Sequence, residues 1–281
     1  MTNLILEIKN LSVIANTTEK VLVNDVSFKI EQNEIIALVG ESGSGKTMTS
    51  AAIMDLLPHG TQKTKGTILI SGVDTNSWSA EKKRSARNTL TSIVMQNPMS
   101  AFDPVLTIFY HFKETIISHN AGETKKTIRE KSENALVRVG FPNPSVILDL
   151  YPFQMSGGML QRVMLAIALL SSPPLIIADE ATTDLDLVSQ KKILELLKEH
   201  CTRNNSSLLL ITHDLGVAAS LANKVILMKN GKIAALQQVK EFFTSPQNDY
   251  AKQLISCHHA LYTDRYNKIM EIIGGDKNEL N

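Results

Sequence analysis

The stretch that decides the fold of this chain is Gly40-Glu41-Ser42-Gly43-Ser44-Gly45-Lys46-Thr47. It matches the pattern G-x-x-x-x-G-K-[ST] in full, between an apolar strand-like segment, residues 35–39, and a helix-forming segment, residues 46–57. Glycines let successive backbone N–H groups wrap a phosphate, and the N-terminus of the following helix adds a favourable dipole. In this setting the Lys46 ammonium reaches the β- and γ-phosphates, and the Thr47 hydroxyl holds Mg²⁺. We therefore predict a nucleotide site.

Two acidic residues, Asp179 and Glu180, end a second apolar segment, residues 175–178. A carboxylate at the end of a strand near the phosphates suits a Mg²⁺ ligand, which is the role we expect for Asp179. Glu180 points another way and can orient or deprotonate an attacking water. Many parallel strands end in Asp, so this pattern alone is weak evidence for a nucleotide site. It becomes strong evidence because a phosphate loop precedes it in the chain.

A third motif, Ser156-Gly157-Gly158-Met159, precedes an apolar helical run, residues 163–170. Ser156 can cap that helix while N–H groups and a hydroxyl face an anion. Taken alone, the motif is better interpreted as a helix-capping glycine turn.

The chain as a whole predicts an α/β fold interrupted by a helical segment. Strands are expected at 4–9, 26–30, 35–39, 66–70, 92–95, 175–178, 207–212, 225–228 and 232–235, and helices at 46–57, 187–200 and 215–221. Asn230-Gly231 is a hairpin signal between the last two strands. We expect an α/β core at 1–103 and 171–256, a mostly helical insertion at 104–170, and an extension at 257–281 whose tail beyond about 272 is disordered.

Composition excludes several classes of protein. A formal net charge of +1 over 281 residues gives no support for nucleic-acid binding, and 43% hydrophobic residues suffice for a sizeable core. No uninterrupted apolar run approaches the roughly 20 residues that span a bilayer, and the N-terminus lacks a signal peptide pattern. We expect the chain to stay in the cytoplasm, so any membrane role must come through a partner. Cys201 and Cys257 fit a reducing compartment, and Cys257-His258-His259 favours an exposed helix end over a metal site.

Six motifs in one order resemble the ATP-binding cassette (ABC) family over nearly the whole chain, from Leu4 to about Ser256. They are the phosphate loop, Gln96, Ser156-Gly157-Gly158, Asp179-Glu180, Asp184-Leu185-Asp186 and His213. The resemblance implies a P-loop NTPase core of ABC type, α/β in class, with an antiparallel β subdomain and an inserted helical subdomain.

The resemblance also implies a role for each matching residue. Gln96 would touch Mg²⁺ and the attacking water, and His213 would contact the γ-phosphate, although a lone histidine there is ordinarily a core or loop residue. Ser156, Gly157 and Gly158 would contact ATP held by another subunit, and Asp186 would lie in a loop that crosses the dimer interface. The implied cofactors are ATP and Mg²⁺. The implied catalytic residues are Glu180, His213 and Gln96; the Mg²⁺ residues are Thr47, Gln96 and Asp179; the ATP-binding residues are Gly40, Glu41, Ser42, Gly43, Ser44, Gly45, Lys46, Thr47, Ser156, Gly157, Gly158 and Asp186.

Three positions depart from the family pattern. Met159 stands where Gln is usual, and Ala181 stands where Pro is usual. The region before Val21 contains no aromatic residue, whereas cassettes commonly stack adenine on one near Ile14 or Ala15. Either nucleotide affinity or base preference is weak, or the adenine rests on an aliphatic surface.

Further segments resemble a narrower family, the importers of oligopeptides, dipeptides and nickel. They are residues 95–98, 101–104 and 245–250. Residues 151–162 and 182–186 are similar to the first ATPase subunit of Nik-type nickel importers, because Asp184 is usually Ala in peptide systems. This resemblance favours nickel, or a related metal complex, and leaves a di- or oligopeptide importer as the alternative.

The importer resemblance implies a set of partners at the cytoplasmic face of the membrane. They are a second, similar ATPase subunit in a heterodimer, two membrane permease subunits and, indirectly, an extracytoplasmic substrate-binding protein; nucleic acid is not among them. Two other functions fit less well. A cassette acting in translation or DNA repair usually carries two phosphate loops or a long coiled coil, and this chain has one loop and no sustained heptads. A regulatory subunit without catalysis would not need Lys46, Glu180 and His213.

Overall fold

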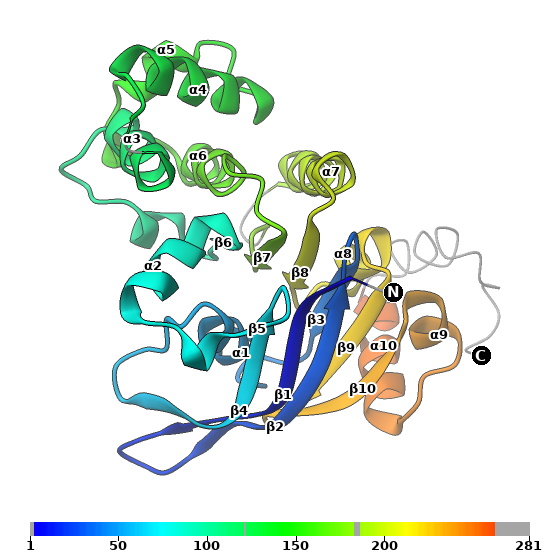
Figure 1. Cartoon of the computed structure of the whole chain (residues 1–281). Coiled ribbons are helices and arrows are strands. Elements are labelled where there is room, and N and C mark those ends of the chain that lie inside the picture. The colour runs from blue at the N-terminus through cyan, green and yellow to red at the C-terminus, as the bar shows by residue number, and fades with distance from the viewer. Residues whose placement is uncertain (1–2, 121, 183–185, 262–281) are drawn as a thin grey trace. The chain divides into compact units, whose positions relative to one another are not determined.

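The computed structural model describes residues 3–120, 122–182 and 186–261, in two compact units (Figure 1). Unit 1 comprises Met1–Ser77 and Ser207–Asn281, and unit 2 comprises Trp78–Ser206. The chain thus passes from one unit to the other between residues 77 and 78 and again between residues 206 and 207. Both boundaries lie outside the helical segment expected at 104–170. The subdomain boundaries taken from the sequence stay a prediction.

An antiparallel sheet forms the first half of unit 1. Its strand order is β2-β1-β4-β5, with bounds β1 Leu4–Ala15, β2 Val21–Glu31, β4 Thr61–Ile70 and β5 Val73–Asp74. The strands run well beyond the expected 4–9, 26–30 and 66–70, because cross-strand pairing carries polar residues such as Gln62 opposite Ile14. Gly66 lies at an irregularity of this pairing: its φ is +100°, and a Cβ atom there would lie 2.6 Å from Leu11 Cα.

Buried strands form the second half of unit 1. β3 (Ile35–Val39) lies between β8 (Ser207–Ile211) and β9 (Lys224–Lys229) and pairs in parallel with both. β10 (Lys232–Gln238) returns antiparallel to β9 through Asn230 and Gly231, both with positive φ, as the hairpin prediction requires. Since β3 and β8 are parallel neighbours, the segments that leave their carboxyl ends start at the same edge of the sheet.

In the described part of unit 1, four helices accompany these strands: α1 (Lys46–Ile53), α8 (Leu215–Leu221), α9 (Val239–Thr244) and α10 (Asp249–Leu261). α1 ends four residues before the expected 57, because Asp55 takes a left-handed conformation with φ of 54°. α9 and α10, which the sequence did not indicate, pack with β3, β9 and α8 in a buried cluster that includes Phe242, Phe243, Ala251 and Ile255. Figure 1 shows them beside β9 and β10.

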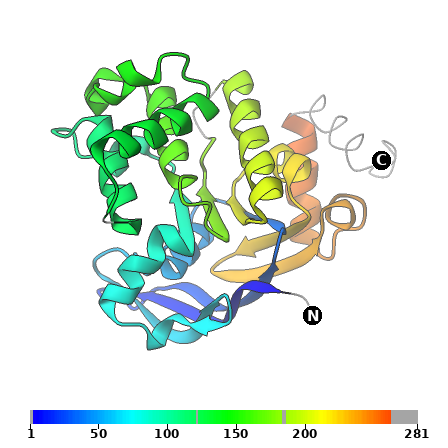
Figure 2. The same ribbon diagram turned by 45° about the horizontal axis from the view of Figure 1, so that its top comes forward.

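Unit 2 combines a parallel strand pair with helices (Figure 2). β6 (Thr91–Val94) pairs with β7 (Leu175–Asp179), and the helices are α2 Ala80–Thr89, α3 Ile108–His119, α4 Lys125–Arg138, α5 Pro144–Leu148, α6 Gly157–Ala168 and α7 Leu187–Asn204. The helical character expected for the middle of the chain is confirmed in α3 to α6. With the strands of unit 1, this content confirms the expected α/β class.

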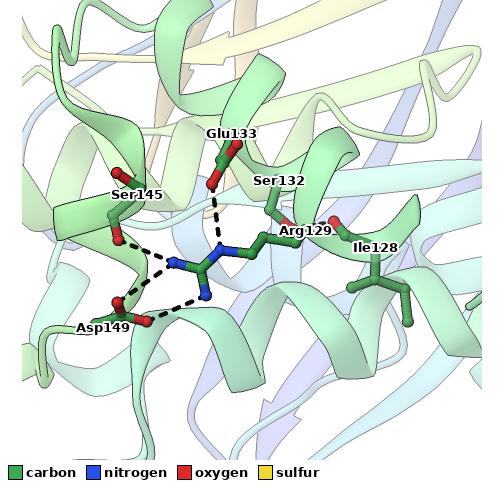
Figure 3. Close-up of polar contacts among 6 residues, drawn as sticks. All are labelled: Ile128, Arg129, Ser132, Glu133, Ser145 and Asp149. Atoms are coloured by element: carbon green, nitrogen blue, oxygen red, sulfur yellow. Dashed lines mark hydrogen bonds and ion pairs between the residues drawn. The ribbon is translucent and has the colours of Figure 1, made fainter. Parts of the chain in front are cut away.

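Arg129 joins α4 to α5 (Figure 3). Its guanidinium donates to both carboxylate oxygens of Asp149 and to the Ser145 carbonyl, each at 3.3 Å, and to Glu133 at 3.2 Å. The Asp149 carboxylate raises the pKa of the guanidinium. Because these groups are partly exposed, each ion pair contributes less than about 1 kcal/mol, and the value of the cluster is to fix the short helix that precedes Ser156.

Within the parts of the chain that the structure describes, no helix is both long and apolar enough to cross a bilayer. Cys201 and Cys257 are both free thiols. Burial within α7 raises the pKa of Cys201 to about 12, whereas Cys257 is exposed on α10.

Phe242→Ala tests whether α9 is part of the core of unit 1. The Phe242 and Phe243 rings meet edge to face with centroids 5.3 Å apart, and Phe242 is fully buried. We expect the free energy of unfolding in urea to fall by about 3 to 5 kcal/mol, since the truncation leaves a cavity. Phe153→Ala is the matched control, because Phe153 is 65% exposed and its loss should change stability by less than about 0.5 kcal/mol. Equal effects of the two variants would contradict the assignment.

Candidate functional site

The phosphate loop joins β3 to α1 in unit 1, and steric contact explains two of its glycines. A Cβ atom at Gly40, whose φ is +149°, would lie 2.3 Å from the Met228 carbonyl oxygen. A Cβ atom at Gly45, whose φ is +105°, would lie 2.7 Å from the Leu22 carbonyl oxygen. No side chain fits at either position, so β2 and β9 press directly against the loop backbone.

Lys46 fixes a positive charge at the centre of this loop. Its buried ammonium donates to the carbonyl oxygens of Gly40 at 2.8 Å and Glu41 at 2.9 Å, and to Ser44 Oγ at 3.4 Å. Phosphate oxygens can replace these acceptors with stronger, charge-assisted hydrogen bonds. The neighbouring Thr47 is exposed in the first turn of α1, where a hydroxyl ligand for Mg²⁺ fits.

The loop that carries His213 begins at the same sheet edge as the phosphate loop, since it follows β8. Thr212 N donates to the Leu38 carbonyl at 3.2 Å, and Thr212 Oγ1 accepts from Asp214 N at 3.0 Å. Asp214 Oδ1 caps α8 by accepting from Gly216 N at 2.7 Å and Val217 N at 3.3 Å. His213 is therefore an exposed residue between two tethered neighbours.

In unit 2 the structure brings Gln96 and Glu180 to the ends of adjacent strands. Val94 pairs with Ala178 in the parallel ladder, and each of the two residues follows two positions later. Asp179 is the buried last residue of β7, and its carboxylate is a ligand type that Mg²⁺ prefers. Glu180 has φ of 49°, a left-handed conformation that costs about 1 kcal/mol or more in a residue other than glycine.

Gln161 connects these two strand ends to α6. Its buried Nε2 donates to the carbonyl oxygens of Ala181 at 2.7 Å and Met95 at 3.4 Å. No sequence pattern had indicated this role for Gln161. The one available signal was its place five residues after Ser156, on the buried face of a helix.

The Ser156 motif begins α6, as its sequence predicts. Ser156 Oγ accepts from Met159 N at 3.3 Å, and both Ser156 and Gly157 are exposed. A Cβ atom at Gly157 would meet nothing within 4 Å, so the fold of this chain does not require glycine there. An exposed helix N-terminus with an unneeded glycine leaves room for the close approach of an anion.

The remaining residues named in the sequence analysis have different outcomes. Asp186 caps α7 by accepting from Val188 N and Ser189 N at 3.0 Å each, and the hydrogen bonds from Ser189 lower the pKa of Asp186. Its place at a dimer interface stays a prediction, and Asp184-Leu185 lie outside the described residues. At the other end of the chain, Ile14 and Ala15 finish β1 opposite Val21 and Thr61, and none of these four side chains is aromatic.

The site residues therefore form two sets. In unit 1 the structure places the phosphate loop and His213 at the carboxyl ends of neighbouring parallel strands, with Lys46 as the fixed cation. In unit 2 it places Gln96, Asp179 and Glu180 at a second pair of strand ends, tied to α6. A cationic phosphate loop and carboxylates able to hold Mg²⁺ and orient water are the groups that phosphoryl transfer requires. Their union in one site stays a prediction.

Comparison with known proteins agrees with these motifs. The ABC transporter family matches residues 23–183. The chain is 40% identical over 244 residues to the nickel import ATP-binding protein NikD of Brucella abortus, covering 87% of this chain and 90% of that protein. It is 39% identical over 257 residues to NikD of Pseudomonas putida, covering 92% and 96%. It is 41% identical over 254 residues to the dipeptide transport ATP-binding protein DppD of Bacillus subtilis, covering 89% and 76%.

Solved structures share the fold. A dimeric ATP-binding cassette in a post-hydrolysis state, bound to ADP and Pi, matches with a TM-score of 0.75 at 25% identity, covering 83% of this chain and 98% of that one. The cbiO1 structure from Clostridium perfringens matches with a TM-score of 0.71 at 22% identity, covering 96% and 99%. These matches confirm the expected P-loop core of ABC type.

Gly40→Ala tests the contact between the phosphate loop and β9. Because the new Cβ atom would overlap the Met228 carbonyl, the loop must shift, and we expect affinity for a fluorescent ATP analogue to fall about 100-fold. The matched control is Gly43→Ala, where a Cβ atom meets nothing within 4 Å and only backbone strain remains. It should lose about 10-fold or less. A Gly40→Ala protein that binds as well as wild type would contradict the steric assignment.

Proposed function

The chain belongs to the ABC transporter family, and from that premise we propose that it binds and hydrolyses ATP to power the uptake of nickel, or of a related metal complex, through membrane partners. The observation that carries the ATPase proposal is the Lys46 ammonium, held inside a glycine loop that neighbouring backbone keeps open. Support for nickel comes from the identity to two NikD proteins and from the resemblance of residues 151–162 and 182–186 to that branch.

Hydrolysis of the γ-phosphate needs positioning and charge stabilisation more than covalent chemistry. The phosphate-loop N–H groups and Lys46 bind the phosphates, and His213 contacts the γ-phosphate from the end of β8. Glu180 orients the attacking water and accepts its proton. Thr47, Asp179 and Gln96 would hold Mg²⁺, which would supply positive charge to neutralise the β- and γ-phosphates. Adenine rests on the aliphatic end of β1 around Ile14, in place of an aromatic ring.

A second cassette completes the site in this proposal. Ser156, Gly157 and Gly158 face the ATP of a similar partner subunit in a heterodimer, and Asp186 lies in the loop that meets it. The exposed N-terminus of α6 and the open space beside Gly157 support this assignment. ATP binding then closes two chains on each other, and a closure of this kind can drive a membrane partner between two states.

Two membrane permease subunits would dock on unit 2, at the cytoplasmic face of the membrane. Large apolar side chains are exposed in several segments of unit 2, including Met99, Val105, Tyr110, Val146 and Phe153. The Tyr151 and Phe153 rings are stacked with centroids 5.5 Å apart, and Phe153 lies three residues before Ser156. Exposed aromatic anchors of this kind mark interaction surfaces. An extracytoplasmic binding protein would deliver the cargo to the permeases.

The alternative is the ATPase subunit of a di- or oligopeptide importer. Identity to DppD over most of the chain favours it, at a level similar to that for the NikD proteins. The two importers share the ATP chemistry, so they differ in the cargo that moves when the cassette works.

Uptake by cells carrying Glu180→Gln decides between these cargoes. The change keeps the shape of the side chain and removes the base, so ATPase activity of the complex should fall about 100-fold or more. We expect uptake of radiolabelled nickel to be lost while uptake of a labelled dipeptide, measured in parallel, is intact. Loss of dipeptide uptake alone would move the chain to the peptide branch. Normal nickel uptake would contradict the proposal.

Phe153→Ala tests the permease surface. If the exposed ring is an anchor, its loss should weaken recovery of the chain with its membrane partners and lower uptake by roughly 5- to 100-fold. Leu236→Ala, which removes an exposed apolar side chain from unit 1, is the control and should have no effect. Unchanged uptake in Phe153→Ala would place the docking surface elsewhere.

A further inference from the structure

α6 has an exposed N-terminus and, about one and a half turns later, a buried polar side chain. Ser156 and Gly157 are exposed, and the proposed function assigns them to the ATP of a partner cassette. Gln161, on the same helix, is only 4% exposed. Burying a side-chain amide costs free energy unless it is hydrogen-bonded, so the hydrogen-bond partners of Gln161 indicate what it does.

The short hydrogen bond of Gln161 reaches the turn that carries the proposed catalytic base. Gln161 Nε2 donates to the Ala181 carbonyl at 2.7 Å, and this bond is buried. Its second bond, to the Met95 carbonyl, is longer at 3.4 Å and correspondingly weaker. Ala181 directly follows Glu180 in the chain. The shorter bond therefore fixes the main chain one residue after Glu180.

The main chain of Glu180 needs such support because it is strained. Its φ of 49° is a left-handed conformation, which residues other than glycine keep only where the surrounding structure holds them. On the other side of the turn, Thr182 Oγ1 accepts from Gln190 Nε2 of α7 at 3.3 Å. Two glutamine amides thus hold the turn, one from α6 and one from α7.

α6 connects its exposed first turn to Gln161 without a break. Ser156 Oγ accepts from Met159 N at 3.3 Å, and Leu160 N donates to the Ser156 carbonyl at 3.0 Å, so the first turn is closed. Leu160 and Val163 are fully buried, which fixes the rotation of the helix about its axis. Five residues of helix span about 8 Å. A small shift of the N-terminus of α6 is therefore carried to the Gln161 amide.

We propose that Gln161 is a positioning residue that couples the nucleotide at the N-terminus of α6 to Glu180 of the same chain. ATP held by the partner cassette sets the position of α6 through Ser156 and Gly157. The Gln161 amide passes that position to the turn of Glu180. The nucleotide of one site thereby controls the catalytic base of the other site. The proposal rests on the ATPase function and the cassette dimer proposed above, and Gln161 itself touches no reacting atom.

This coupling has a kinetic signature that a purely structural role lacks. Glu180 acts on the water in the transition state, so a displaced Glu180 lowers kcat. Both carbonyls that Gln161 holds belong to unit 2, whereas Lys46 and the phosphate loop belong to unit 1. KM and the equilibrium affinity for ATP should therefore hardly change. A general loss of folding would instead lower kcat, ATP affinity and unfolding temperature together.

Gln161→Met tests the hydrogen bond in the assembled transporter complex. Methionine keeps an unbranched chain of similar length and donates no hydrogen bond. We expect kcat for ATP hydrolysis to fall about tenfold, with KM and the affinity for a fluorescent ATP analogue within about twofold of wild type. Gln161→Glu, which places an acceptor against the Ala181 carbonyl, should lose at least as much kcat. Gln190→Met is the matched control, because it removes an amide bond from the same turn on the α7 side, and its kcat should stay within about twofold of wild type.

Ser156→Ala tests the route from the partner's nucleotide. The complex is assembled with a partner cassette whose own catalytic glutamate is replaced by glutamine, so hydrolysis reports on Glu180 of this chain alone. Ser156→Ala should lower kcat about fivefold in the otherwise wild-type chain, and less than about twofold when Gln161→Met is already present, because both changes interrupt one route. Independent effects would multiply to about 50-fold in the double variant and would overturn the coupling.

Unchanged kcat in Gln161→Met and Gln161→Glu would also overturn the proposal, as would a fall in kcat matched by losses of ATP affinity and unfolding temperature. A Ser156→Ala complex with the kcat of wild type would do the same. Glu180→Gln in the same complex separates these outcomes from failure of the function itself. Hydrolysis that survives Glu180→Gln would refute the ATPase proposal, whereas hydrolysis that Glu180→Gln abolishes and Gln161→Met leaves intact would refute the coupling alone.

Discussion

The architecture of unit 1 depends on backbone packed directly against backbone at the phosphate loop. The Leu22 carbonyl from β2 and the Met228 carbonyl from β9 occupy the space where side chains at positions 45 and 40 would lie. This backbone contact holds the loop open without help from a side chain at position 40 or 45. The Lys46 ammonium is therefore held in one position inside the loop. The backbone contact also requires β3 to lie beside β9, which is the arrangement that brings the end of β8 to the same edge.

The sequence predicted the parts of this structure that are encoded locally. β3 and α8 have the expected bounds, and the Asn230-Gly231 hairpin follows from residues that accept positive φ. The long ends of β1 and β4 were missed because their polar residues become strand only through pairing with each other. α9 and α10 were missed for a related reason: their apolar residues become a core only against β9 and α8.

The candidate site shows the same division between local and distant contacts. Motif residues such as Lys46, Ser156 and Glu180 lie at the strand ends and helix N-termini that their patterns indicate. Tyr250 and His258 carry no motif chemistry, and their contacts with Lys229 and Asp214 join residues far apart in the chain. Only the folded chain brings these pairs together, so a sequence pattern read along one segment does not contain them.

Gln161 links two strand ends of unit 2 that carry residues proposed for the chemistry. One side-chain amide, with two hydrogens and two acceptors, holds the carbonyls of Met95 and Ala181 at once. The residues beside those carbonyls, Gln96 and Glu180, are therefore linked through a single side chain, and a displacement of one strand end pulls on the other. Under the proposed function, such a linkage coordinates the two groups at ATP, so Gln96 and Glu180 take up their working positions together.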